Sequence, residues 1–114
     1  MIIWHNPRCS KSRQTLKILE EAGASHEVRL YLEDVPSSDE IQSVLGKLGL
    51  KARELLRTSE QDYKDLGLKD PSLTEHALLE AMHSHPKLIE RPIVISGSSA
   101  VIGRPPENVE SLLG

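Results

Sequence analysis

The segment MIIWHNPRCSKSRQTLKILEEAGASHEVRLYL (residues 1–32) predicts a strand, a helix and a second strand. Residues 1–4 are apolar, and residues 1–5 run into Asn6-Pro7, which is typical of a short buried strand that ends at a turn. Residues 10–22 carry apolar side chains at helical spacing, and residues 26–32 alternate as a strand does. The side chains predicted to face the core are Leu16, Leu19, Ala22, Val28, Leu30 and Leu32. Because a helix joins the two strands, we expect them to be parallel.

Helices are predicted in the middle of the chain, and a hairpin follows them. Four helical segments lie between about residues 37 and 85, and the first begins at a capping box formed by Ser37 and Glu40. Residues 91–95 and 100–102 predict two strands joined by a tight turn, and a last helix follows. The predicted order is therefore βαβ, then helices, then ββα.

This order of elements is typical of the thioredoxin-like fold. We expect an α/β protein with a mixed sheet, forming a single domain of residues 1–114 with a helical insertion at about residues 37–85. In folds of this type the reactive thiol lies at the start of the first helix. A proline before the third strand often forms a cis peptide bond beside that thiol, and Pro92 occupies this position.

Composition excludes several classes of protein. The 114 residues suit one compact domain, and the absence of Phe requires an aliphatic core. A net charge of −3 argues against a nucleic-acid binder, and no apolar segment approaches the roughly 18 residues that span a membrane. The single cysteine excludes an internal disulfide, a multi-cysteine zinc site and dithiol chemistry by this chain alone. We expect a cytoplasmic protein with no metal site.

Cys9 lies between the first predicted strand and helix, where the free N–H groups of a helix start favour a thiolate. Arg8, Lys11 and Arg13 add three nearby cations, so we expect the pKa of the Cys9 thiol to be lowered. Ser12 is one helical turn further on and can direct its hydroxyl at the sulfur. The alternative is that Cys9 is a small buried apolar residue.

Four further side chains are candidates for the same site. His5 ends the first strand near the loop, where it could modulate the thiolate or be structural. Arg57, Arg91 and Arg104 are far apart in sequence, and the predicted fold brings two of them towards Cys9. Arg91 precedes the predicted cis proline and Arg104 ends the last strand, whereas Arg57 ends a helix of the insertion and could fold over the site. Because arginine forms forked hydrogen bonds to oxyanions, a nucleophilic cysteine with several arginines favours attack on a tetrahedral oxyanion. Alternatively, each arginine is a surface charge.

Several motifs, in order along nearly the whole chain, resemble the glutaredoxin-coupled arsenate reductases of the ArsC type. The first is WHNPRCSKSR (residues 4–13), which is similar to the active-site segment of that family. The others are Leu30-Tyr31-Leu32-Glu33, Glu54-Leu55-Leu56-Arg57, Leu66-Gly67-Leu68, Glu90-Arg91-Pro92-Ile93-Val94 and Gly103-Arg104-Pro105. Arg8, Ser10 and Lys11 replace the smaller residues of the well-known members, and in this the chain resembles a shorter subgroup of the family.

The resemblance implies a function and a role for each matching residue. It implies that Cys9 attacks arsenate, that glutathione attacks the resulting adduct as a co-substrate, and that glutaredoxin completes the release of arsenite. It also implies that no cofactor is bound. The implied roles are oxyanion binding by Arg57, Arg91 and Arg104, thiolate support by His5 and Ser12, and a cis peptide bond at Pro92. Arg13 is assigned to thiolate support for its nearby charge. We expect a monomer without nucleic-acid or membrane partners.

Two other functions remain open from the sequence. One is a redox- or stress-related regulatory module that binds RNA polymerase, although Ser12 stands where such regulators have a second cysteine. The other is a monothiol glutaredoxin-like thiol reductase, for which the three arginines are unnecessary.

Overall fold

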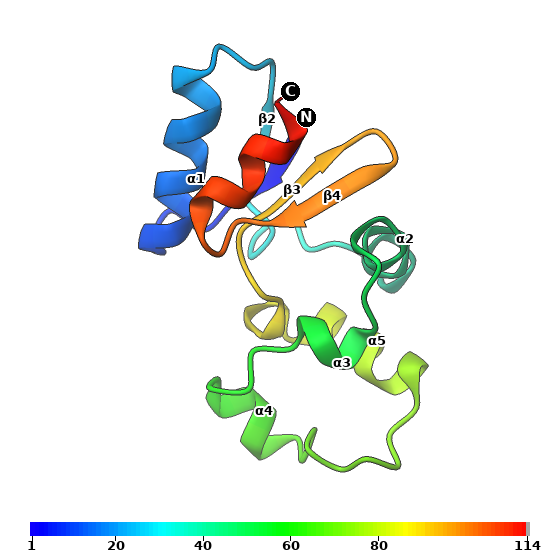
Figure 1. The fold of residues 1–114 in the computed structure, drawn as a ribbon. Helices are drawn as coiled ribbons and strands as arrows, with labels where there is room; N and C mark the ends of the chain where they lie inside the picture. The colour runs from blue at the N-terminus through cyan, green and yellow to red at the C-terminus, as the bar shows by residue number, and fades with distance from the viewer. Residues whose placement is uncertain (114) are drawn as a thin grey trace. The chain divides into compact units, whose positions relative to one another are not determined.

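The computed structural model describes residues 1–113, which form two compact units (Figure 1). The first unit comprises Met1–Asp34 together with the chain from Arg91 onward, and the second comprises Val35–Glu90. Gly114, the last residue of the predicted domain, lies outside the described residues. Within residues 1–113, no helix has the length and apolar character needed to cross a membrane.

The first unit contains a mixed four-stranded sheet. The strands are β1 (Ile2–Trp4), β2 (Glu27–Arg29), β3 (Ile93–Ser96) and β4 (Ser99–Ile102), in the order β2-β1-β3-β4. Strand β1 is parallel to β2 and antiparallel to β3, and β3 is antiparallel to β4. The parallel pair and the hairpin predicted from the sequence are therefore confirmed, and they form the thioredoxin-like arrangement.

Two helices pack against the sheet of the first unit. Helix α1 (Ser10–Glu21) follows β1, and the 3-10 helix η2 (Pro106–Leu112) follows β4 and lies alongside α1 (Figure 1). The core of this unit is the fully buried cluster of Ile3, Leu19, Val94 and Val109. Since α1 and η2 each contribute one of these side chains and the strands contribute the others, this core joins helices to sheet.

Strand β2 differs from its prediction. It covers only Glu27–Arg29, and Val28 and Leu30, which were predicted to face the core, are 45% and 37% exposed. Tyr31 is fully buried instead. The physical reason is that β2 is the edge strand, paired only with β1, and that the chain turns after it, with the N–H of Asp34 donating to the carbonyl of Leu30 at 2.8 Å.

The buried face of α1 also differs from its prediction. Ser12, Thr15 and Leu19 are buried, whereas Leu16 is only partly buried and Ala22 is exposed. The first turns of α1 bury polar side chains because those side chains have hydrogen-bond partners there. Thr15 Oγ1, for example, donates to the carbonyl of Lys11 at 2.8 Å.

The second unit is helical and contains the insertion predicted for residues 37–85. Its elements are α2 (Ser38–Leu48), α3 (Ala52–Leu55), α4 (Gln61–Asp65), α5 (Glu75–Ser84) and the 3-10 helix η1 (Pro86–Leu88). The capping box is confirmed, because the Ser37 hydroxyl accepts from the Glu40 N–H at 3.1 Å and the Glu40 carboxylate accepts from the Ser37 N–H at 3.0 Å. An isolated antiparallel bridge joins Leu56 to Ile89 after α3 and η1.

Candidate active site

The loop between β1 and α1 is held in one conformation by its own backbone and by an arginine. The Cys9 N–H donates to the carbonyl of Asn6 at 3.0 Å, and the Asn6 side chain accepts from the N–H of Arg8 at 3.0 Å. Arg13 reaches back from α1 and donates from Nη1 to the carbonyl of Pro7 at 2.8 Å. The structure therefore places Arg13, a predicted thiolate-supporting residue, on the loop backbone next to the cysteine.

A buried polar pair lies beneath this loop. His5 Nδ1 and Ser12 Oγ are 2.6 Å apart, and Ser12 Oγ also accepts from the N–H of Asn6 at 3.0 Å. Burial lowers the pKa of His5, the positive charge of Arg13 lowers it further, and Glu20 partly opposes them. His5 is therefore neutral at neutral pH, and through Ser12 it fastens the end of β1 to the first turn of α1.

Cys9 is the N-cap residue of α1 and only 8% exposed. Burial raises the pKa of its thiol, but this effect is outweighed by the N–H groups of Ser12 and Lys11 and the side chain of Arg91, which favour the thiolate, and by the charge of Arg91. The net result is a lowered pKa, as the position at a helix start predicts. Ser12 acts here through its backbone N–H, whereas its hydroxyl bonds to His5 and Asn6.

Arg104 also contacts the sulfur of Cys9. Its Nη2 lies 3.5 Å from Cys9 Sγ, and its Nε donates to the carbonyl of Arg91 at 2.7 Å. The Arg104 guanidinium, from the segment after β4, thus contacts both the backbone of Arg91, two residues before β3, and the thiol of Cys9. Two arginines separated by most of the chain from Cys9 meet at its sulfur, which is an arrangement suited to an oxyanion bound at the thiolate.

The peptide bond before Pro92 is cis, as the thioredoxin-like order of elements predicts, and so is the bond before Pro105. The carbonyl of Pro92 accepts from the Gly103 N–H at 2.9 Å. A Cβ atom on Gly103 would lie 2.5 Å from Thr15 Oγ1 and 2.8 Å from Pro92 Cγ, so only glycine fits there. This close approach of β4, α1 and Pro92 sets the position of the adjacent Arg104.

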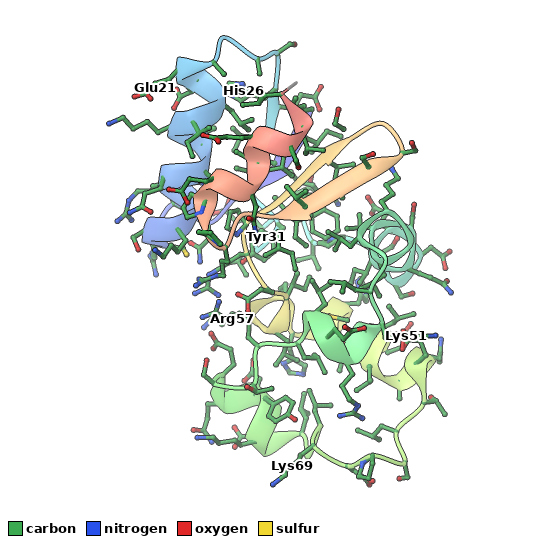
Figure 2. The ribbon with its side chains drawn as sticks, in the orientation of Figure 1. Glu21, His26, Tyr31, Lys51, Arg57 and Lys69 are labelled. Carbon is green, nitrogen blue, oxygen red and sulfur yellow. The ribbon has the colours of Figure 1, made fainter. Side chains whose placement is uncertain are left out.

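Arg57 belongs to the second unit. Figure 2 shows it beside the yellow η1 segment, where its N–H donates to the carbonyl of Leu88 at 2.8 Å. Its guanidinium pairs with Glu90 at 2.7 Å and with Glu60 at 3.4 Å. Its part in the Cys9 site stays a prediction.

Three residues near the site were missed by the sequence reasoning. Asn6 was interpreted only as part of a turn, although both its carbonyl and its side chain hold the loop. Thr15 was not singled out, and Gly103 appeared only as part of the Gly103-Arg104-Pro105 motif, because a polar residue in a helix and a glycine before an arginine are common patterns. The one sequence feature that could have drawn attention to Thr15 is its position on the apolar side of an amphipathic helix, where a polar side chain is unusual. Within residues 1–113, no three His, Cys, Asp or Glu side chains gather as a group able to hold a metal ion.

The lowered pKa of Cys9 gives a prediction about its reactivity. The rate of alkylation by iodoacetamide is expected to rise with pH through a midpoint below the ordinary thiol value of about 8.5, whereas in urea the midpoint returns to that value. The same shift stabilises the folded chain above the unfolded pKa, and this contribution disappears as the pH falls through the folded pKa. Because Cys9 is the only cysteine, mass spectrometry of the intact chain measures the rate directly. A folded-state midpoint at or above the urea value would contradict the prediction.

The fold and this geometry define a class of protein, namely a thioredoxin-like protein with one activated cysteine flanked by arginines. The particular family follows from comparison with known proteins. The model of the ArsC family matches residues 4–112, which include Cys9 and all three candidate arginines, and the chain belongs to this family.

Similar proteins are known along the full length of the chain. It is 52% identical over 113 residues to the uncharacterized protein YfgD of Escherichia coli, covering 98% of this chain and 95% of that protein. It is 49% identical over 112 residues to a protein of Neisseria meningitidis named arsenate reductase, with coverage of 97% and 96%. A solved structure described as an arsenate reductase from Vibrio cholerae superimposes with a TM-score of 0.94 at 49% identity, covering 96% of this chain and 94% of that one. These structural relatives confirm the thioredoxin-like fold.

Proposed function

We propose that this protein is an arsenate reductase that converts arsenate to arsenite. The observation that carries the proposal is the thiol of Cys9, whose pKa is lowered and whose sulfur is approached by Arg91 and by Arg104 Nη2 at 3.5 Å. The names of relatives about half identical to this chain support the same activity.

The first chemical step forms an arsenic–sulfur bond. The Cys9 thiolate attacks arsenate, one arsenic–oxygen bond breaks, and the oxygen leaves as water after taking up protons. Arsenic remains pentavalent in this adduct, so no electrons have yet been transferred. Arg91 and Arg104 stabilise the negative charge on the oxygens as it shifts during the attack, because guanidinium groups donate to oxyanions through parallel N–H groups.

The two electrons come from thiols outside the chain, since Cys9 is its only cysteine. In the proposed sequence, glutathione attacks the adduct and forms a second arsenic–sulfur bond, while a second arsenic–oxygen bond breaks and its oxygen leaves as water after taking up protons. A glutaredoxin thiolate then attacks the glutathione sulfur, which leaves as a mixed disulfide and gives its bonding electron pair to arsenic. Water hydrolyses the remaining bond to Cys9, releasing arsenite and the free thiol.

The experiment that tests this function is a coupled assay on the purified protein. Arsenate, glutathione, glutaredoxin, glutathione reductase and NADPH are combined, and NADPH consumption is measured with each component omitted in turn. We expect consumption that requires arsenate, glutathione and glutaredoxin together. Reduction of a glutathione mixed disulfide without arsenate turnover would instead identify a thiol reductase, and recovery of RNA polymerase subunits by an inactive protein would identify a regulator.

Replacing Arg91 by Lys is expected to lower kcat/KM for arsenate by about ten- to a hundredfold. Lysine keeps the charge but cannot donate two parallel N–H groups to an oxyanion, and its ammonium does not reproduce the hydrogen bond to Cys9. The coupled assay measures the change.

A matched control is Arg53→Lys, the same substitution at a guanidinium that bridges the carbonyls of Leu68 and Asp70 in the second unit. It is expected to lower thermal stability and to leave kcat/KM unchanged. Full activity in Arg91→Lys would contradict the assignment of Arg91 to the oxyanion.

A further inference from the structure

The side chain of Asn108, in the first turn of η2, reaches back to the segment that carries Arg104. Its Nδ2 donates to the carbonyl of Ile102 at 3.1 Å and to the carbonyl of Arg104 at 3.0 Å. Carbonyl oxygens only accept hydrogen bonds, so the amide nitrogen and not the amide oxygen must face them. Pro105 and Pro106, which follow Arg104, have no N–H to donate. Asn108 therefore supplies two donors where the neighbouring backbone has none.

The segment that Asn108 contacts is a tight three-residue turn. The Arg104 N–H donates to the carbonyl of Ile102 at 2.9 Å, with only Gly103 between the two residues. The Gly103 N–H donates to the carbonyl of Pro92 at 2.9 Å, which connects the turn to the residue before β3. The Ile102 carbonyl thus accepts both from the turn itself and from Asn108. The backbone of Arg104 is held at its N–H by the turn and at its carbonyl by Asn108.

The position of this backbone determines where the Arg104 guanidinium lies. The guanidinium contacts the Arg91 carbonyl through Nε at 2.7 Å and Cys9 Sγ through Nη2 at 3.5 Å. Because an arginine side chain is long and flexible, a small rotation of its backbone moves the guanidinium much further. All these residues, and Asn108 with them, belong to the first unit. The contacts of Asn108 with the turn therefore bear directly on the contact of Arg104 with the sulfur.

We propose that Asn108 is a positioning residue for the oxyanion site. By bonding to the carbonyls of Ile102 and Arg104, it holds the Arg104 guanidinium where an oxyanion at the Cys9 sulfur is bound. The inference rests on the proposed function, in which Arg104 is one of the oxyanion-binding arginines. Asn108 acts through Arg104, since its amide bonds to the backbone of the turn and not to the reacting atoms.

The test is Asn108→Ala, which removes both hydrogen bonds without adding a charge. Asn108 is exposed, so the variant should fold, and in the coupled assay its kcat/KM for arsenate is expected to fall by about five- to twentyfold. Ser111→Ala is the matched control. Ser111 Oγ donates to the backbone carbonyl of Asn108 at 3.0 Å, so this variant removes a side-chain hydrogen bond within η2 and leaves the turn untouched. Its kcat/KM should be unchanged.

A double variant distinguishes the positioning of Arg104 from general support of the fold. In the Arg104→Ala background, Asn108→Ala is expected to change kcat/KM by less than about twofold, because no guanidinium remains to be positioned. The assay is run at a raised protein concentration, since Arg104→Ala itself lowers the rate. A loss as large in this background as in the unchanged chain would show that Asn108 only supports the fold, and would overturn the proposal.

A binding measurement separates this inference from the proposed function. In the Cys9→Ser background, calorimetric titration with arsenate measures the Kd without chemistry, and Asn108→Ala is expected to raise it by the same factor. Weaker binding in that variant, without reduction by the Cys9-containing chain, would reject the proposed reaction and retain the positioning role. Reduction with an unchanged kcat/KM in Asn108→Ala would reject the positioning role alone. Absence of both binding and reduction would overturn both.

Discussion

Replacement of Cys9 by Ser is expected to reduce arsenate turnover to the rate measured without protein. The hydroxyl of serine stays protonated near neutral pH, so the variant lacks the nucleophile that forms the arsenic–sulfur bond. The surrounding N–H groups and the Arg91 guanidinium, which lower the pKa of the thiol, cannot make a hydroxyl ionise to a comparable extent. The coupled assay with the purified variant measures the effect.

The folding of the Cys9→Ser variant can be checked independently of its activity. Serine is close in size to cysteine and is a favourable N-cap residue, so α1 should start at the same place and circular dichroism and thermal unfolding should change little. Arsenate binding should persist, because Arg91 and Arg104 are untouched. Turnover that survives this substitution would remove Cys9 from the mechanism and with it the proposed function.

Replacement of Gly103 by Ala is expected to lower the free energy of unfolding by about 2–3 kcal/mol. The added methyl group would lie 2.5 Å from Thr15 Oγ1, 2.8 Å from Pro92 Cγ and 3.1 Å from Thr15 Cγ2. Thr15 is fully buried and Pro92 is a ring, so neither can move aside easily and the strand, the helix or both must shift. Because Arg104 follows directly, arsenate turnover is expected to fall as well. Urea unfolding measures the stability.

Two further variants sharpen this prediction. Gly46→Ala makes the same chemical change in the interior of α2, where a Cβ atom meets nothing within 4 Å, and should stabilise the chain by about 0.5–1 kcal/mol. Thr15→Ala removes both Thr15 atoms near the new methyl group, so in the Gly103→Ala background it should cost less than it does alone. Additive losses in that double variant would show that the close contact is not the cause.

The fold could be predicted where local patterns and tertiary structure agree. The apolar strand before Asn6-Pro7, the amphipathic helix after Cys9 and the capping box at Ser37 are local features, and each is present as predicted. Strand β2 is present and parallel to β1 as predicted, but its length and its core-facing side were predicted wrongly. Alternation cannot distinguish an edge strand from one paired on both sides, and the side chains of Val28 and Leu30 remain exposed there.

The site could be predicted in its residues but only partly in its geometry. The order of elements was sufficient to expect Arg91 and Arg104 near Cys9, and the structure brings both to the sulfur. The spacing of Cys9 and Ser12 suggested a hydroxyl aimed at the thiol, but spacing does not include the competing partner His5, which forms a 2.6 Å contact with that hydroxyl. A side chain is excluded at Gly103 because this residue lies against Thr15 of α1 and against Pro92. Such a contact between segments distant in sequence cannot be predicted from a local sequence pattern.

Strand β1 ends in the only tryptophan of the chain, Trp4, which is 2% exposed and lies under the guanidinium of Arg29 at 5.7 Å from the ring centroid. Its emission therefore originates from one known place, directly before His5 and the loop that carries Cys9. The indole is shielded from water, so its fluorescence should be blue-shifted in the folded chain and should shift to longer wavelength when β1 separates from β2. The protein thus contains an intrinsic fluorescent probe next to the loop that carries Cys9, which requires no label and leaves the single thiol unmodified.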